Sequence, residues 1–292
     1  MPEYLREGLH KGVPMEFYVG DPCVEPSASK GALHRIITQS PAHARYWHPR
    51  LNPNCPKDDS SRADLGSAIH AAILGGADLV YLPEDFKDWR KKEAQAFRDD
   101  ARAVGKIPLL EHQRMDIQSA KASAVELLRT LPGWTDKCMD DTEGTMIWRD
   151  GKVWKRGRYD IWAEPINTMI DVKTTANADP SSWLRSSLLG GGYDLQSEHY
   201  LDGLAANGAA DDGTTFMFLL VEIEPPFCCS FVGLGPEYSD FAKRKLAKAT
   251  EMWAQCMESG KWPGYSTVPH WAELRGFEEV QFADKNASTE GA

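Results

Sequence analysis

The chain has 292 residues, 42% of them hydrophobic, which is enough to bury the core of one sizeable domain. Its 43 acidic and 33 basic residues give a net charge of −10, which argues against a protein that coats nucleic acid by bulk electrostatic attraction. No stretch approaches about 18 uninterrupted apolar residues, and acidic residues stand at the N-terminus. The sequence therefore argues against a membrane protein or a secreted one.

Six cysteines are spread along the chain without a C-x-x-C pair and without the spacing of a zinc or iron–sulfur site. We interpret them as buried thiols in a reducing compartment. This agrees with a soluble, intracellular protein.

Residues 1–26 contain several glycines and prolines and are expected to be an irregular lead-in. Ser27 or Ser29 can then cap a helix that runs to about Thr38. Ser40-Pro41 begins a second, short helix, and a proline-rich loop covers 49–61.

The segment from Arg62 to about Leu74 carries an apolar stripe at helical spacing, with His70 at its border. A lone histidine in such a place is more often a core residue than a ligand. Two charged, amphipathic helices are predicted next, over 84–104 and 111–131, joined at Gly105–Pro108 and packed outside a sheet.

A pair of strands is predicted over 142–148 and 153–163, joined by a turn at Asp150-Gly151, with Glu143 at the start of the first strand. Asp160 lies near the end of the second strand. Turn residues at 164–167 then favour a hairpin into the next strand, Ile170-Asp171-Val172-Lys173-Thr174-Thr175.

This hairpin carries the chemistry of the chain. Side chains alternate along a strand, so Asp171 and Lys173 project to one face, and an antiparallel return brings Asp160 beside Asp171. Two adjacent carboxylates repel each other, and a divalent cation between them removes the repulsion, which implies Mg²⁺ or Mn²⁺. Lys173 can orient or deprotonate a metal-bound water or neutralise charge on a phosphate. Taken alone, the Asp-x-Lys tripeptide is more often an ordinary surface salt bridge.

Basic side chains near Asp160 can line a path for phosphates even in an acidic protein. Those on the predicted hairpin are Arg149, Lys152, Lys155, Arg156 and Arg158, with Arg185 further on. A solvated, charged hairpin face is an equally good interpretation of any one of them.

Asp179-Pro180 can begin a helix that runs through Leu189, and three glycines interrupt the chain before a further helix, 193–206. Gln196 and Tyr200 are four residues apart and share a face of that helix. Apolar strands over 214–224 and 227–233 and a long helix over 238–257 complete a single domain, 27–282, before a flexible tail, 283–292.

The order of these segments resembles the PD-(D/E)xK nucleases, and within them the RecE-like and lambda-exonuclease-like recombination exonucleases of phages. The matching segments are Ser29-Lys30-Gly31-Ala32-Leu33, Ser40-Pro41-Ala42-His43, Leu65-Gly66-Ser67-Ala68-Ile69-His70, Lys155-x-Gly157-Arg158-x-Asp160, Ile170 to Thr175, and Gly192-Tyr193-x-x-Gln196-x-x-x-Tyr200. The resemblance implies an α/β (α+β) fold with a central mixed sheet flanked by helices, of the restriction-endonuclease type.

The resemblance also implies roles for particular residues. It places His70 and Glu143 with Asp160 and Asp171 at the metal site, and Gln196 and Tyr200 in the catalytic site, where they hold phosphate oxygens or the lysine. Ser40 and Arg45 become candidates for binding a terminal phosphate, although a structural cap and a surface arginine are the commoner interpretations.

By the same resemblance, the protein is expected to digest linear double-stranded DNA from its ends, 5′ to 3′, in the cytoplasm of a bacterial host cell. The expected partners are DNA ends, a single-strand annealing protein and further copies of the chain in a ring, a trimer or tetramer. Two alternatives stay open: an endonuclease of the same fold and a non-catalytic DNA-binding module. The sequence contains no G-x-x-x-x-G-K-[ST] loop and no H-E-x-x-H, which argues against an ATP-driven motor and a zinc protease.

Overall fold

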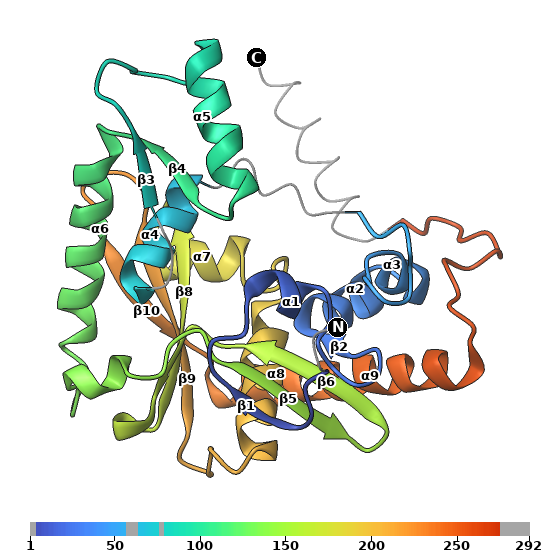
Figure 1. Ribbon diagram of the computed structural model, residues 1–292. Coiled ribbons are helices and arrows are strands. Elements are labelled where there is room, and N and C mark those ends of the chain that lie inside the picture. Colours follow the sequence, from blue (N-terminus) through green and yellow to red (C-terminus); the bar gives the residue numbers. More distant parts are fainter. Residues whose placement is uncertain (1–3, 57–63, 76–78, 275–292) are drawn as a thin grey trace, which may run out of the picture.

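The computed structural model describes residues 4–56, 64–75 and 79–274. Within these ranges the strands form three sheets, and helices cover their faces (Figure 1). One of these sheets combines parallel and antiparallel strand pairs, so the predicted α/β class with a central mixed sheet is confirmed.

The mixed sheet has the strand order β10-β9-β8-β7. Its strands are β7 (Ile161–Ala163), β8 (Thr168–Thr175), β9 (Thr215–Glu222) and β10 (Cys229–Gly233). β8 runs parallel to β9, whereas β7 and β10 run antiparallel to their neighbours. The short helix η3 (Glu164–Ile166) and Asn167, in a left-handed conformation, connect β7 to β8, as the predicted hairpin requires.

The second sheet has the order β1-β5-β6-β2, formed by β1 (Gly8–His10), β2 (Ala28–Ser29), β5 (Thr145–Asp150) and β6 (Val153–Arg158). Residues 1–26 were expected to be irregular, but they contribute β1 and helix α1 (Met15–Val19). Asp21, which is only 1% exposed, fixes this segment because it accepts hydrogen bonds from Ser27 and pairs with Arg156 of β6. Elements of three and five residues leave too weak a periodic pattern to be recognised in the sequence.

The two sheets meet at the end of β6. β5 pairs with β6 so that Thr145 lies opposite Arg158, and an isolated bridge between Thr142 and Ile161 continues the same register into β7. The predicted strand 153–163 is therefore one line of chain with an interruption at Tyr159 and Asp160. The interruption frees Asp160 from regular pairing while keeping it at the sheet.

Helices cover both faces of the mixed sheet (Figure 1). α4 (Asp64–Leu74) and α6 (Gln113–Leu128) bury the face that carries Ile170 and Val172. α7 (Pro180–Ser186) and α8 (Tyr193–Ala206) cover the opposite face, where Met169 and Phe218 pack. Asp171 and Lys173 share the second face, as strand alternation predicts.

Three further helices, α2 (Lys30–Thr38), α3 (Pro41–Tyr46) and α9 (Pro236–Ser259), pack together beside α8. The predicted caps are confirmed: Ser29, Ser40 and Asp179 each accept a hydrogen bond from the first turn of their helix. No helix in the described ranges is long and apolar enough to cross a membrane.

The two helices predicted over 84–104 and 111–131 are present as α5 (Lys92–Ala103) and α6. Two parallel strands that were not predicted, β3 (Leu79–Leu82) and β4 (Ile107–Leu110), come before and after α5. Short apolar runs such as these cannot be told from the ends of buried helices by periodicity. Other short helical turns include η2 (Asp136–Met139).

α8 lies close to β5 because Gly203 has no side chain. A Cβ there would stand 2.9 Å from the buried indole of Trp148 and 3.2 Å from the sulfur of Met146. We predict that Gly203→Ala lowers the free energy of unfolding by on the order of 1 kcal/mol, since overpacking of about 1–3 kcal/mol exceeds the helix-propensity gain of up to about 1 kcal/mol. Urea unfolding would measure this. Gly264→Ala, which meets nothing within 4 Å, is the control, and equal stabilities of the two variants would contradict the prediction.

Candidate functional site

Two carboxylates face each other across the β7–β8 ladder. Ile161 pairs with Ile170, so Asp160 and Asp171 lie opposite one another where the ladder opens. The Oδ2 atom of Asp160 accepts a hydrogen bond of 2.7 Å from the backbone N–H of Val172, which ties the first carboxylate to the strand of the second. The predicted juxtaposition is therefore present in the structure.

Lys173 neutralises the second carboxylate. Its Nζ atom forms an ion pair with Oδ2 of Asp171, on the face shared by the two side chains. Burial would lower the pKa of Lys173, but the charges of Asp171 and Asp160 outweigh burial and raise it. Lys173 is therefore a protonated cation near neutral pH, which suits the neutralisation of phosphate charge better than the deprotonation of water.

The two carboxylates have opposite pKa shifts. Burial, together with the charge of Asp160, raises the pKa of Asp171 to about 6, although Lys173 acts in the other direction. At Asp160 burial also acts to raise the pKa, but the hydrogen bond and charge of His70 reverse its effect and lower it. One carboxylate thus stays ionised while the other is close to taking up a proton.

His70 reaches this pair from α4. Its Nε2 atom lies 3.1 Å from Oδ2 of Asp160, and its side chain is 32% exposed. Gly66, one turn earlier, lets α4 approach β8, since a Cβ there would stand 2.8 Å from the hydroxyl of Thr174. Burial lowers the pKa of His70, and the bond to Asp160 more than compensates, so the net shift is upward.

α8 approaches from the opposite face. Gln196 donates a hydrogen bond from Nε2 to Oδ1 of Asp171, so it holds the carboxylate and not the lysine. Tyr200, 8% exposed, packs against Gly157 of β6. Burial and the nearby charges of Asp171 and Asp160 raise the pKa of its hydroxyl. Both side chains lie at the site; their catalytic roles stay predictions.

Glu143 is placed differently from its prediction. It precedes β5 in a left-handed turn with φ of 53°, and its carboxylate lies 3.4 Å from the guanidinium of Arg158. The backbone N–H of Glu143 donates a hydrogen bond to the carbonyl of Asp160, so its backbone lies next to the site. Its side chain, however, is paired with Arg158. Its role as a metal ligand stays a prediction.

The donor chemistry of His70, Asp160 and Asp171 fits a divalent metal ion, with hard carboxylate oxygens and one imidazole nitrogen. In the described ranges, however, no three histidine, cysteine or acidic side chains are arranged as a metal site. Lys173 and His70 occupy carboxylate oxygens of Asp171 and Asp160, so these contacts would have to rearrange for an ion to bind.

The predicted basic lining is wrong for its central members. Lys155 and Arg156 are only 1% and 4% exposed. Lys155 forms ion pairs with Asp150 and Asp202, and Arg156 forms one with Asp21. Arg149 pairs with Glu7 at the surface. Lys155 and Arg156 therefore stabilise the second sheet and are not available to bind phosphates.

The four predicted substrate-binding residues have different surroundings: Arg158 and Ser40 have protein partners, whereas Arg185 and Arg45 are exposed. Arg158 is tied to the carbonyl of Val13 as well as to Glu143, whereas Arg185 is exposed on α7. Ser40 is a buried cap whose hydroxyl bonds to the ring of His43, and Arg45 is exposed. Substrate binding by these four side chains stays a prediction.

Two residues at the site received no role from the sequence. Lys30, the first residue of α2, and Tyr193, the first of α8, meet beside Lys173: each lysine Nζ lies over the tyrosine ring, at 4.8 Å and 5.1 Å from its centroid. Both stand in the matching motifs, but no spacing rule links residues so far apart in the chain.

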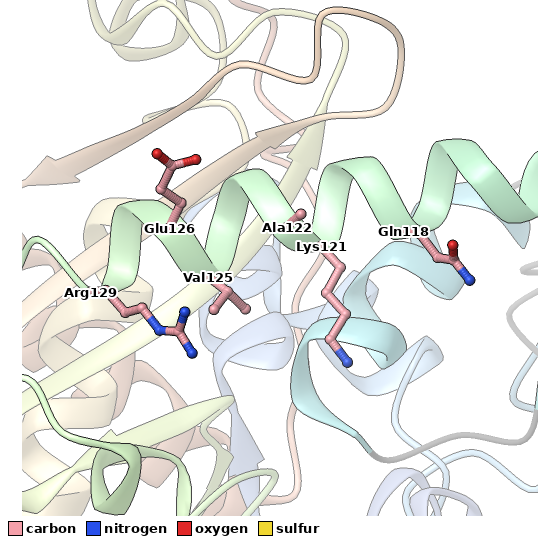
Figure 2. Close-up of a pocket in the computed structure, with 6 residues that line it drawn as sticks. All are labelled: Gln118, Lys121, Ala122, Val125, Glu126 and Arg129. Atoms are coloured by element: carbon pink, nitrogen blue, oxygen red, sulfur yellow. The ribbon is translucent and has the colours of Figure 1, made fainter.

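A surface depression of about 540 Å³ lies elsewhere, along α6 (Figure 2). It is lined by Gln118, Lys121, Ala122, Val125, Glu126 and Arg129. None of the grouped carboxylates, the histidine or the lysines of the site contributes to it.

Residues 37–269 match the family described as PDDEXK-like domain of unknown function (DUF3799). The chain belongs to this PDDEXK-like family. Asp171-Val172-Lys173 has the acidic-x-Lys spacing contained in that designation, and the catalytic roles of Asp160, Asp171 and Lys173 stay predictions. The match confirms the restriction-endonuclease-like fold and a nuclease type of domain, and nucleases of this kind generally use divalent metal ions.

One solved structure supports the same fold. A candidate exonuclease from Eubacterium rectale is similar at a TM-score of 0.53 and 10% identity, covering 93% of this chain and 98% of its own. A phage related exonuclease from Haemophilus somnus 129PT reaches a TM-score of 0.32 at 13% identity, covering 80% and 96%. The first likeness supports the PDDEXK-like fold alone, and the second is too weak to support an argument. No protein of curated function matches the sequence.

The pKa shifts at the site predict how metal affinity depends on pH. Below about pH 6 Asp171 is protonated, and a proton must leave before the carboxylate can bind an ion; the raised pKa of His70 acts in the same direction. We expect Mn²⁺ affinity, measured by calorimetry, to fall below this range by up to about tenfold per pH unit for each of the two protons displaced. Asp171→Asn should bind weakly at every pH. An affinity that stays constant between pH 5 and 8 would contradict the assignment.

Proposed function

We propose that this PDDEXK-like protein is a metal-dependent deoxyribonuclease that hydrolyses linear double-stranded DNA from its ends. The observation that carries the proposal is the meeting of Asp160, Asp171 and Lys173, with His70 and Gln196 against the two carboxylates. A surface salt bridge needs none of these additional contacts.

Each side chain has a defined task in this proposal. Asp160 and Asp171, with His70, would hold a divalent ion, Mg²⁺ or Mn²⁺, which supplies charge neutralisation and an activated water when it is bound. Lys173 holds its proton at Nζ and can donate to a phosphate oxygen as charge develops there. Gln196 fixes the rotation of Asp171 through Oδ1. Tyr200 packs against Gly157 of β6 beside the site.

The finer features of the proposal come from the resemblance to recombination exonucleases. They are 5′ to 3′ polarity, a 3′-tailed product passed to a single-strand annealing protein, action in the cytoplasm of a bacterial cell, and a ring of subunits around the DNA. The acidic composition is compatible with a ring, because an encircled substrate is retained by topology and needs only local basic contacts.

The test compares a 5′-labelled linear duplex with a covalently closed circle, with Mg²⁺ and with a chelator. We predict digestion of the linear duplex alone, complete loss with the chelator, and a fall in kcat on the order of 10²–10³-fold for Lys173→Ala. Lys248→Ala, on the outer side of α9 with its side chain 58% exposed, is the control and should retain full activity.

Particular results would count against particular parts. Cleavage of the closed circle would favour an endonuclease and end the claim of digestion from ends. A Lys173→Ala variant as active as the control would contradict the site itself. No cleavage by the wild-type protein on any DNA, with Mg²⁺ or Mn²⁺, would favour a non-catalytic binding module.

A further inference from the structure

Lys30 is a second cation at the site, and it comes from a different element than Lys173. Its Nζ atom donates a 2.6 Å hydrogen bond to the carbonyl of Gly191 and lies over one side of the Tyr193 ring. Lys173 lies over the same ring, so α2 and β8 each bring one lysine to it. The two ammonium groups are close enough that Lys173 lowers the pKa of Lys30.

The two lysines differ in how their charge is balanced. Lys173 has the carboxylate of Asp171, whereas Lys30 has no carboxylate within ion-pair distance in the described part of the chain. Burying a cation without a counter-ion costs free energy. Burial, followed by the charge of Lys173, lowers the pKa of Lys30 to about 8, so it is still mostly protonated at neutral pH. An anion placed here would offset the cost.

The surroundings hold Lys30 in this place. The Tyr193 ring stacks on Trp183 at an interplanar angle of 10° and tilts against Phe218. Gly191 leaves room for the ring, because a Cβ there would stand 2.6 Å from it. Ser29 caps α2, whose N-terminus adds partial positive charge beside Lys30. A flexible surface lysine would show none of these restraints.

We propose that Lys30 binds a non-bridging oxygen of a DNA phosphate adjacent to the scissile one. This inference rests on the proposed function, since it takes the Asp171–Lys173 face as the place of cleavage. Lys173 then serves the reacting phosphate and Lys30 its neighbour, with the Tyr193 ring in contact with both. The neighbouring phosphate is either internal or the terminal 5′-phosphate, and both share the same chemistry.

The experiment measures DNA binding without cleavage. Fluorescence anisotropy with a labelled duplex, in Ca²⁺ or a chelator, gives the dissociation constant at several salt concentrations for wild type, Lys30→Gln, Lys30→Arg and the control Lys248→Gln. We expect Lys30→Gln to weaken binding on the order of tenfold and to reduce the salt slope by about 0.9, the value for one phosphate contact, while Lys30→Arg keeps the slope. Duplexes with 5′-phosphate and 5′-hydroxyl ends distinguish the two sources. If Lys30→Gln weakens binding only to the 5′-phosphate duplex, Lys30 binds the terminal phosphate. If it weakens binding to both duplexes, Lys30 binds an internal phosphate.

A salt slope of Lys30→Gln equal to that of Lys248→Gln would overturn the inference, even if urea unfolding showed lower stability, because a purely structural lysine leaves the slope unchanged. Its failure is distinct from failure of the proposed function. If wild type cuts DNA but the two variants bind alike, only Lys30 is wrongly assigned. If wild type neither binds nor cuts DNA, the proposed function itself is wrong.

Discussion

The repulsion between Asp160 and Asp171 is the constraint on which the rest of the structure depends. Two carboxylates held opposite each other in a buried ladder are stable only if other groups offset their charge. Each is satisfied from a different direction: His70 and the Val172 amide serve Asp160, while Lys173 and Gln196 serve Asp171. Helices on both faces of the sheet are therefore tied to one point.

Small residues make these approaches possible. Gly66 lets α4 lie against Thr174, and Gly157 and Gly203 let α8 lie against the second sheet. The backbone contributes as well. Regular strand pairing is interrupted at Tyr159 and Asp160, between β6 and β7, and the Asp160 carboxylate there accepts a hydrogen bond from β8. The site therefore depends on glycines that lack a Cβ and on an interruption in strand pairing, as well as on the functional side chains.

How much the sequence predicted depends on the range of the interaction. Strand alternation and turn residues suffice for the hairpin of Asp160 and Asp171, and cap residues suffice for the helix starts at Ser29, Ser40 and Asp179. Pairings between distant segments left no local signal, which is why β1, the β3–β4 pair and Lys30 went unseen. Lys155 and Arg156 were misjudged because composition cannot say whether a basic side chain faces water or a buried carboxylate.

The environment of these basic side chains also bears on the proposed action of an acidic protein on DNA. With Lys155, Arg156 and Arg149 paired to carboxylates, a net charge of −10 is not relieved by a broad basic surface on the hairpin. Attraction to a phosphate must then come from cations close to the reacting group, where low exposure strengthens each contact. Lys173 and Lys30 both meet that requirement, each with its Nζ atom over the same tyrosine ring. Under the proposed function, the protein would contact the DNA backbone at few points, and the proposed ring of subunits would retain a long substrate by enclosing it more than by affinity.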